Sequence, residues 1–231
     1  MSKHIVEQFR NNTGILSKTD LNFISNHKGI IVGVGGLGGN VANNLVRLGI
    51  GELLLIDFDT FDLSNLNRQL FSNHNNIGSS KVNVLHERLT EINPLCIINI
   101  LEKRIEDVAI DIMSGYDFII DAVDTPKTKV LISDIADKLQ LPLLHGSCAG
   151  WYGQVGWILP GCKLINETYG NNESGLEKEL LNPSFTPSVI AGVMCSEYAK
   201  FVKRDKETVI NEFVLIDILT NSILHTGKNN G

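Results

Sequence analysis

The sequence predicts an α/β fold in which a mainly parallel sheet is flanked by helices and extended by C-terminal antiparallel strands. Three observations predict it. Short apolar runs alternate with helix-like segments between residues 29 and 147. A dense glycine run, GVGGLGG at 33–39, stands between the first such strand and the first such helix. An apolar hairpin pattern lies at residues 212–227, near the end of the sequence.

Length and composition favour one globular domain over residues 1–231, because no linker and no internal repeat interrupts the pattern. The apolar fraction of 43% and the charged fraction of 20% are typical of a soluble protein with a core. The net charge of −6 argues against a nucleic-acid partner. The sequence shows no apolar signal segment and no membrane-spanning run, so we expect a cytoplasmic protein.

The first third of the chain contains a polar arm followed by a strand, a helix and a second strand. Residues 1–28 are polar and form an N-terminal arm, with one short helix expected near 19–26. The run GIIVGV at 29–34 predicts a buried strand. Apolar residues at helical spacing predict a helix over 38–48, and ELLLID at 52–57 predicts the second strand.

The middle of the chain continues this alternation. Residues 58–80 are rich in Asn, Ser and Asp, which predicts a loop with a short helix. Helices are expected over 81–92 and 126–139. Further strands are expected over 96–102, 117–123 and 142–147. A strand–helix–strand series of this kind predicts parallel pairing beneath covering helices.

The last third of the chain has a different character. Alternating residues at 153–159 predict a strand that follows the parallel series. Residues 161–186 carry no clear pattern, and we interpret them as a mobile crossover loop. A helix over 187–203 then leads to a hairpin of two strands, at 212–219 and 222–227, around a Thr-Asn turn.

The glycine run fits the spacing G-x-G-x-x-G with Gly33, Gly35 and Gly38, between a strand and a helix. Such a turn brings backbone close to a ligand and presents free helix N–H groups to a phosphate. Asp57 ends the next strand, where an acidic side chain accepts hydrogen bonds from ribose hydroxyls. The pattern therefore indicates a Rossmann-like nucleotide site, and by itself leaves open which nucleotide binds there.

The segment after Asp57, DFDTFDLSNLNRQLF, favours ATP over a nicotinamide cofactor. A guanidinium such as that of Arg68 makes paired hydrogen bonds to phosphate oxygens, and Lys81 adds a second cation. A nicotinamide enzyme has no need for this polar cluster. Asp59 and Asp124 lie near strand ends and are suited to Mg²⁺.

Several of these stretches together resemble a known family. The run from GVGGLGG to SNLNRQLF, then IGSSKV and DAVDTPKTK, is similar to the adenylating domain of the ThiF/MoeB/HesA family, relatives of ubiquitin-activating enzymes. The resemblance is strong over residues 29–159, and the SNLNRQ motif is its most specific part. Residues 182–202 and 215–223 resemble the closing helix and hairpin of that family.

The resemblance implies an enzyme that uses ATP and Mg²⁺ to adenylylate the C-terminal carboxylate of a small ubiquitin-fold sulfur carrier ending in Gly-Gly. It implies catalytic roles for Arg68, Lys81 and Asp124, with Asp124 as the Mg²⁺ ligand. It also implies a homodimer. The nucleotide-binding positions carried over are Gly33, Gly35, Gly36, Gly38, Asp57, Asp59, Asn65, Asn67, Arg68, Gln69, Lys81, Asp124 and Thr125.

The cysteines depart from the family pattern. Cys96, Cys148, Cys162 and Cys195 are scattered without a CxxC pair, so we expect reduced thiols and no zinc site. Residues 163–194 contain no cysteine that could hold a carrier covalently, and Cys195 is expected to pack inside a helix. These departures favour the thiamine-type branch, with the molybdopterin type possible. The alternatives are a tRNA threonylcarbamoyladenosine dehydratase, a non-catalytic scaffold that binds nucleotide or carrier, and a nicotinamide dehydrogenase.

Overall fold

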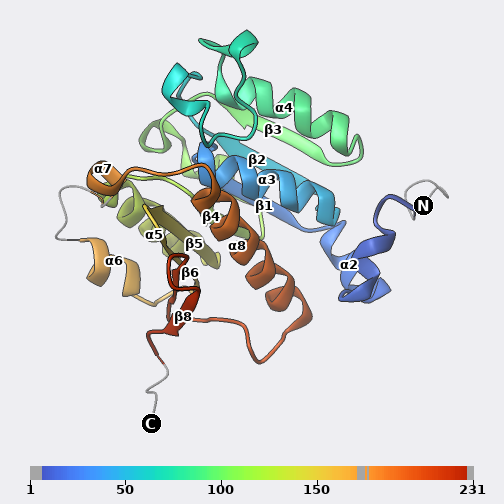
Figure 1. The fold of residues 1–231 in the computed structure, drawn as a ribbon. Coiled ribbons are helices and arrows are strands. Elements are labelled where there is room, and N and C mark those ends of the chain that lie inside the picture. Colours follow the sequence, from blue (N-terminus) through green and yellow to red (C-terminus); the bar gives the residue numbers. More distant parts are fainter. Residues whose placement is uncertain (1–6, 171–174, 176, 228–231) are drawn as a thin grey trace.

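The computed structural model describes residues 7–170, 175 and 177–227, and in this part of the chain the strands form one eight-stranded sheet (Figure 1). The strand order is β3-β2-β1-β4-β5-β6-β7-β8. Strands β1 to β5 pair in parallel, and β6, β7 and β8 continue the sheet antiparallel. Their bounds are Lys28–Val32, Glu52–Ile56, Ile97–Leu101, Phe118–Asp121, Leu143–Ala149, Tyr152–Ile158, Val214–Asp217 and Ser222–His225.

Helices cover both faces of this sheet, and each face has its own apolar core. One core joins the sheet to α2 (Lys18–Ile24), α3 (Gly36–Leu48), α4 (Lys81–Ile92) and α8 (Phe185–Lys203). The other core lies under α5 (Pro126–Leu139) and α6 (Leu164–Tyr169). The short helix α7 (Glu177–Leu180) follows α6, and single-turn helices fill the loops at Arg10–Gly14, Leu63–Asn65, His74–Asn76, Ile105–Asp107 and Ile110–Met113.

The central strands are buried on both faces, which explains their continuous apolar sequences. In β1, Ile31 packs into the core beneath α3 and α8, whereas Ile30 and Val32 pack into the core beneath α5. Successive side chains of a strand point to opposite faces, so a strand covered twice needs apolar residues at every position. The predicted α/β class, with helices on both faces and an antiparallel extension, is confirmed.

The bounds of the predicted helices and strands agree with the structure within two residues, and the differences at the glycine run have a clear physical cause. The strand predicted over 29–34 ends at Val32, because Gly33 has a φ of +83° and turns the chain out of the sheet. The following helix begins at Gly36 instead of residue 38, so part of the glycine run belongs to the first helical turn. The helices predicted over 81–92 and 126–139 match α4 and α5.

The prediction of a patternless loop over 161–186 is wrong for part of that segment. Helix α6 forms there because Ile165 is fully buried in the core beneath α5, and α7 follows at Glu177–Leu180. A helix of six residues is too short to show periodicity in a sequence. Residues 171–174 and 176 of the predicted mobile loop lie outside the described residues.

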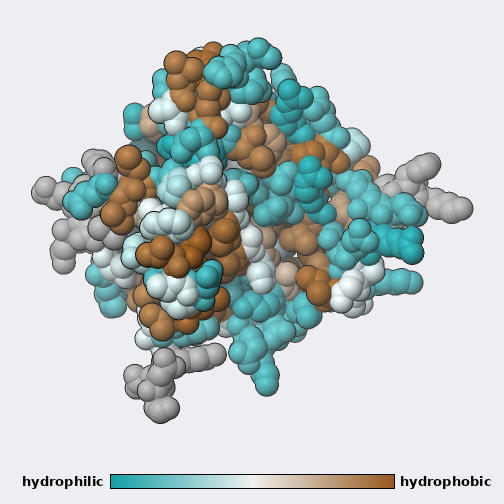
Figure 2. Space-filling model, in the orientation of Figure 1, coloured by the Kyte–Doolittle hydropathy of each residue, from teal (hydrophilic) through white to brown (hydrophobic). Residues whose placement is uncertain are grey.

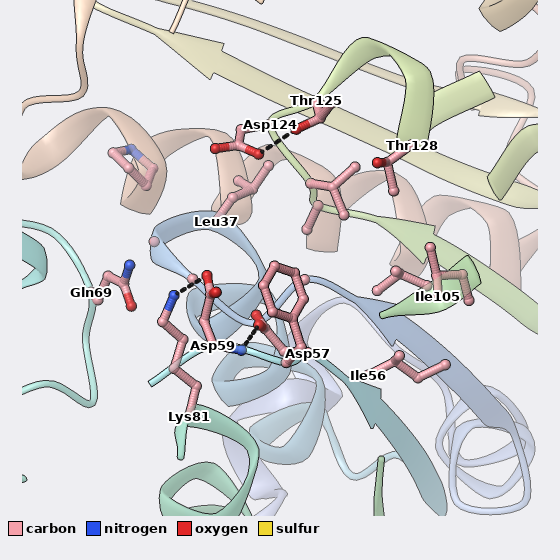
Figure 3. A pocket seen from close by; sticks show the side chains of 18 of the residues that line it. Leu37, Ile56, Asp57, Asp59, Gln69, Lys81, Ile105, Asp124, Thr125 and Thr128 are labelled. Carbon is pink, nitrogen blue, oxygen red and sulfur yellow. Dashed lines mark hydrogen bonds and ion pairs between the residues drawn. The ribbon is translucent and has the colours of Figure 1, made fainter. Parts of the chain in front are cut away.

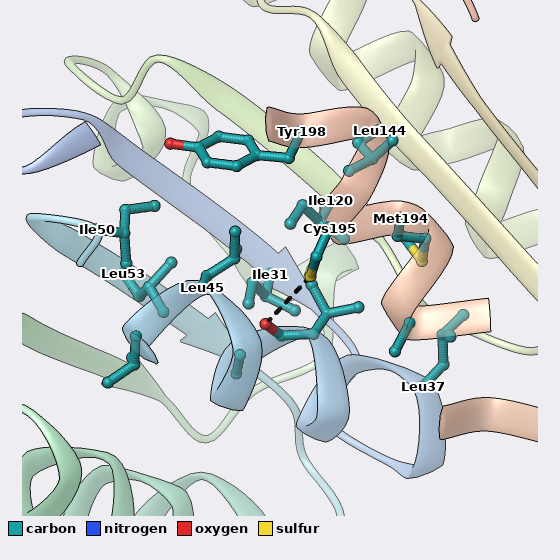
Figure 4. Close-up of a cluster of buried hydrophobic side chains, with 14 of the residues drawn as sticks. Ile31, Leu37, Leu45, Ile50, Leu53, Ile120, Leu144, Met194, Cys195 and Tyr198 are labelled. Atoms are coloured by element: carbon teal, nitrogen blue, oxygen red, sulfur yellow. Dashed lines mark hydrogen bonds between the residues drawn. The ribbon is translucent and has the colours of Figure 1, made fainter. Parts of the chain in front are cut away.

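The cysteines are free thiols, and three of the four are buried. Figure 4 shows Cys195 on α8 with its side chain toward α3, and its Sγ lies 3.9 Å from the carbonyl oxygen of Val41. Burial raises the pKa of Cys195 to about 12, so the thiol stays protonated and packs as an apolar group, as predicted. Within the described ranges, no three metal-ligating side chains gather into a cluster.

The C-terminal hairpin leaves an apolar surface. Leu219, Ile223 and Leu224 are more than half exposed on β8 and the turn before it, and hydrophobic residues gather over this end of the sheet in Figure 2. Among the described helices, none combines the length and the apolar character needed to cross a membrane.

Candidate nucleotide site

A cavity of about 320 Å³ lies at the carboxyl ends of β1, β2, β4 and β5. The chain passes from β1 outward to β2 and β3 on one side, whereas β4 and β5 lie on the other side. Ligands of α/β sheets bind at such a reversal of strand order, because the loops on its two sides diverge there and leave a crevice. The position of this cavity is therefore the one expected for a nucleotide.

The glycine run shapes one wall of the cavity. A Cβ atom on Gly38 would lie 1.9 Å from the carbonyl oxygen of Gly33, so only glycine lets α3 approach the end of β1 this closely. Gly35 is the N-cap residue of α3 and supplies no side-chain acceptor to the first helical turn. Gly35 and Gly36 line the cavity, which places the partial positive charge of the helix N-terminus at its wall.

Asp57 holds this turn in place from the end of β2. Its carboxylate accepts the backbone N–H of Val34 at 2.7 Å and that of Asp59 at 2.9 Å. Burial raises the pKa of Asp57, and the two backbone hydrogen bonds act in the opposite direction. The side chain is 8% exposed and still lines the cavity, where remaining lone pairs can accept ribose hydroxyls.

Lys81 and Asp59 form an ion pair at the same wall, with 3.0 Å between Nζ and Oδ2 (Figure 3). Lys81 is buried as the first residue of α4, and its backbone N–H donates to the carbonyl oxygen of Asp59 at 3.0 Å. Asp59, considered as a metal ligand from sequence, is thus the counter-ion of Lys81. An ammonium group has three donors, so Lys81 can still bind a phosphate oxygen.

Arg68 lines the cavity through a different set of bonds. Its Nη1 donates to the carbonyl oxygen of Ser64 and to Oδ1 of Asn67, each at 2.9 Å. The hydrogen bonds to Ser64 and Asn67 orient the guanidinium of Arg68. Arg68 forms no salt bridge with any described residue, so no carboxylate among them neutralises its charge. Gln69 lies beside it, buried, and its Oε1 has no hydrogen-bond partner among the described residues. A buried acceptor without a protein donor is open to a donor from water or from a bound ligand.

Asp124 and Thr125 face the Lys81 wall from the far side of the cavity (Figure 3). They follow β4 and precede Pro126, the first residue of α5, and both are exposed. Thr125 Oγ1 donates to Oδ1 of Asp124 at 3.2 Å. Carboxylate and hydroxyl oxygens are the donor set that suits Mg²⁺, which binds through one or two carboxylates together with substrate phosphates.

The cavity brings together eleven of the thirteen predicted nucleotide-binding residues. Gly38 packs beneath the loop and does not line the cavity, and Asn67 donates instead to the carbonyl oxygen of Asn182 at 3.0 Å. Asn65 lines the wall, and its Oδ1 accepts the N–H of Asp62 in a capping box.

Sequence reasoning missed several wall residues. Arg104 lies over the ring of Phe58, 3.6 Å from its centroid, and both line the cavity. The pair Lys103-Arg104 follows β3, and a basic pair at a parallel strand end is a signal that could have been used. Ser147 and Cys148 at the end of β5 gave no such signal, because neither stands in a motif.

Fold and cavity together define an α/β protein of the Rossmann-like class, with a candidate nucleotide site at the carboxyl ends of its strands. The chain belongs to the ThiF family, whose family model matches residues 9–230. The resemblance found in the sequence is thereby confirmed.

Curated relatives match parts of the chain. MoeZ of Mycobacterium tuberculosis, a probable adenylyltransferase/sulfurtransferase, is 28% identical over 212 residues, 86% of this chain and 53% of MoeZ. The adenylyltransferase and sulfurtransferase MOCS3 of Dictyostelium discoideum is 37% identical over 57% of this chain and 31% of its own. The tRNA threonylcarbamoyladenosine dehydratase of Haemophilus influenzae is 45% identical over 101 residues, which cover 43% of this chain and 39% of the dehydratase. This chain thus spans about a third to about half of these relatives.

Solved structures share the fold at low identity. Escherichia coli MccB in complex with MccA-N7isoASN superposes with a TM-score of 0.79 at 20% identity, covering 100% of this chain and 73% of that one. The E. coli tRNA N6-threonylcarbamoyladenosine dehydratase, solved in complex with ATP, superposes with a TM-score of 0.74 at 22% identity. The match covers 88% of this chain and 96% of the dehydratase.

Proposed function

We propose that this protein uses ATP to adenylylate a C-terminal carboxylate of a small acceptor protein. The acceptor carboxylate oxygen attacks the α-phosphorus, the bond from that phosphorus to the bridging oxygen of the β-phosphate breaks, and pyrophosphate leaves. A carboxylate is already ionised at neutral pH, so the step needs no general base. Its requirement is stabilisation of the negative charge that develops on the phosphates.

One observation carries this proposal: the N-terminus of α3, with no side-chain cap, shares a single cavity with two cations, Arg68 and Lys81. A nicotinamide cofactor presents two phosphates and needs no additional pair of cations. A triphosphate that releases pyrophosphate gains from both. Arg68 makes planar, paired hydrogen bonds to phosphate oxygens, whereas Lys81 acts as a point charge.

The other residues of the cavity take complementary roles in this proposal. Asp57 accepts the ribose hydroxyls, and the buried Oε1 of Gln69 accepts a donor from the ligand. Asp124, supported by Thr125, would hold Mg²⁺, which supplies Lewis-acid polarisation of the phosphate oxygens when bound. The remaining ligands of the ion would be phosphate oxygens and water.

The names of similar proteins support one type of acceptor protein for this proposal. The resemblance implies a ubiquitin-fold sulfur carrier that ends in Gly-Gly. The cysteine pattern favours the thiamine-type branch, but MoeZ and MOCS3 bear adenylyltransferase/sulfurtransferase names, and the molybdopterin-synthase adenylyltransferase of Porphyra purpurea is 37% identical over 54% of this chain. We therefore propose a molybdopterin-type carrier as the acceptor. The implied homodimer stays a prediction.

ATP–pyrophosphate exchange with a Gly-Gly-ended carrier tests the proposal. We expect carrier-dependent exchange by the unmodified protein, and a loss of about 10²-fold or more in Arg68→Ala, because a preorganised donor to the transition-state charge is removed. Arg88→Ala is the matched control, since Arg88 is exposed on α4 and pairs with Glu91. Equal exchange by the Arg68 and Arg88 variants would contradict the proposal.

A second candidate function is tRNA threonylcarbamoyladenosine dehydration. It is favoured by the 45% identity to the Haemophilus influenzae enzyme over 101 residues. The same cavity would then bind ATP, and the acceptor would be the modified nucleoside of a tRNA. ATP hydrolysis that is stimulated by such a tRNA, together with no exchange for any carrier, would replace the first proposal by this one.

A further inference from the structure

A buried chain of polar side chains leads from the end of β4 into the wall of the cavity. Asp121 and His145 are both 0% exposed, and 2.7 Å separates Oδ2 of Asp121 from Nδ1 of His145. Nε2 of His145 lies 3.1 Å from the hydroxyl of Tyr169, and that hydroxyl lies 3.2 Å from Oγ of Ser147. Ser147 lines the cavity, so these four linked side chains end at the cavity wall.

The charges at the buried end of this chain are fixed. Burial alone would raise the pKa of Asp121, but the Lys129 ammonium and the hydrogen bond from His145 outweigh it and hold the pKa below its ordinary value. Both Asp121 oxygens lie 3.4 Å from Nζ of Lys129. Burial lowers the pKa of His145, so its imidazole is neutral at neutral pH.

An ionised carboxylate and a neutral imidazole determine the tautomer of His145, and the hydroxyl protons then follow from the hydrogen bonds of Tyr169 to His145 and Ser147. Asp121 can only accept, so Nδ1 of His145 carries the proton and Nε2 is the acceptor. The Tyr169 hydroxyl must therefore donate to Nε2. Its oxygen then accepts the proton of the Ser147 hydroxyl, and the lone pairs of Ser147 are left for the cavity. Ser147 is thus an acceptor toward whatever binds beside it.

Sheet geometry indicates where Ser147 lies relative to Asp57, the residue proposed to bind the ribose. Asp57 follows β2 and Ser147 lies at the end of β5, with β1 and β4 between them. Three strand spacings separate β2 from β5 by roughly 14 Å. If the ribose binds at Asp57 and the phosphates bind at the N-terminus of α3, the end of β5 with Ser147 lies beyond the phosphates and is left for the acceptor carboxylate.

We propose that Ser147 accepts a hydrogen bond from the backbone N–H of the acceptor's C-terminal residue, and that Asp121, His145 and Tyr169 are positioning residues that keep Ser147 an acceptor. This proposal rests on the proposed adenylylation, since it names the acceptor contact of that same cavity. Tyr169 is the last residue of α6, so the chain also ties α6 to the cavity wall.

The hydroxyl chain, which is the series of hydrogen bonds that links Asp121, His145, Tyr169 and Ser147, is tested first, without any substrate. Nitrogen NMR of the full chain labelled at histidine should show His145 with Nδ1 protonated and Nε2 bare at neutral pH. The His145 signals should shift in Tyr169→Phe, which removes the donor to Nε2. They should not shift in Tyr116→Phe, the matched control, whose hydroxyl bonds Glu52 and Asn99 instead. A proton on Nε2 would overturn the proposal.

The acceptor contact is tested by exchange kinetics with the same Gly-Gly-ended carrier. We expect Ser147→Ala to raise KM for the carrier about tenfold, the loss of one neutral hydrogen bond, with kcat and KM for ATP within about twofold. Tyr169→Phe should raise KM for the carrier several-fold. The double variant should be no worse than Ser147→Ala alone, because both changes act through one hydroxyl. Equal melting curves establish that each variant is folded.

The outcomes separate the two proposals. A rise in KM for ATP in place of KM for the carrier would assign Ser147 to a ribose hydroxyl and overturn the acceptor contact. Unchanged constants in both variants would also overturn it. If the unmodified protein shows no exchange at all, the proposed function and this contact fail together. The NMR result then still decides whether the hydroxyl chain exists.

Discussion

Two aspartates of the cavity wall, Asp59 and Asp124, differ in the side chain to which each carboxylate is bonded. Asp59 is occupied by the Lys81 ammonium, whereas the partner found for Asp124 is the Thr125 hydroxyl. An aspartate neutralised by a buried lysine is a poor cation ligand, because binding a metal would separate that pair. The side chains of Asp124 and Thr125 are exposed at the cavity and carry only oxygen donors.

This difference predicts how the two asparagine variants behave. Asp124→Asn should lower exchange by about 10²-fold and should raise the Mg²⁺ concentration needed for half-maximal activity, because a charged ligand is lost. Asp59→Asn is the matched control and should leave the Mg²⁺ requirement unchanged. Titration of exchange activity with MgCl₂ measures both. An identical Mg²⁺ requirement in Asp124→Asn and the unmodified protein would refute the assignment.

At the scale of elements, the contact between β1 and α3 determines the shape of the cavity wall. The N-terminus of α3 reaches the turn after β1 because Gly38 has no side chain, and Gly33 turns the chain with its φ of +83°. Neither residue needs to touch a ligand for this. The two glycines keep the first turn of α3 close enough to the sheet for its N–H groups to face the cavity.

Alanine at Gly38 should therefore destabilise the protein. Its Cβ would lie 1.9 Å from a backbone oxygen that cannot move without shifting β1 or α3. Overpacking of this kind costs about 2 kcal/mol or more, a fall in Tm of roughly 4–8 °C at this chain length. Thermal melts followed by circular dichroism measure it.

Gly192→Ala is the matched control for that experiment. Gly192 lies inside α8, and no atom of a neighbouring element comes within 4 Å of the position that an added methyl group would take. The change should therefore raise stability by about 0.5–1 kcal/mol through helix propensity. If Gly38→Ala had the same Tm as the unmodified protein, the close approach of α3 to the end of β1 would not be needed for stability.

At the scale of the whole molecule, buried ionisable groups make stability depend on pH. Burial lowers the pKa of His145 and of His27, so the folded protein holds fewer protons on them than the unfolded chain does. Their contribution to stability is complete above the unfolded pKa of about 6.5 and is lost as pH falls through it toward the folded pKa. The lowered pKa of Asp121 adds a further loss at more acidic pH.

We therefore expect the free energy of unfolding, measured by urea denaturation, to decrease as the pH is lowered from about 7.5 to about 5.5. His145→Gln should show a smaller fall over this interval, because one of the groups that gains a proton on unfolding is gone. His86→Gln, a change at a position on the outer side of α4, is the control and should keep the full fall. A His145→Gln protein with an undiminished fall would contradict the burial argument.

Much of the fold and of the candidate site follows from local sequence. Asp57 and Lys81 stand next to strand and helix ends that periodicity alone locates, so the loops that carry them could be placed at one edge of the sheet. The exact ends of β1 and α3 could not, because they depend on the conformation of Gly33 and on contact with β4. Helix α6 was missed because long-range burial of Ile165 stabilises it.

Periodicity and turn chemistry are local properties, and they are sufficient for the order of the elements, the parallel sheet and most of the residues that face a nucleotide. The pairing of charges is not local and depends on the assembled structure. Asp59 meets Lys81 from 22 positions away, and Asp121 meets His145 from 24 positions away on the neighbouring strand. Such partners depend on strand order and register, and these arise only when the whole sheet assembles.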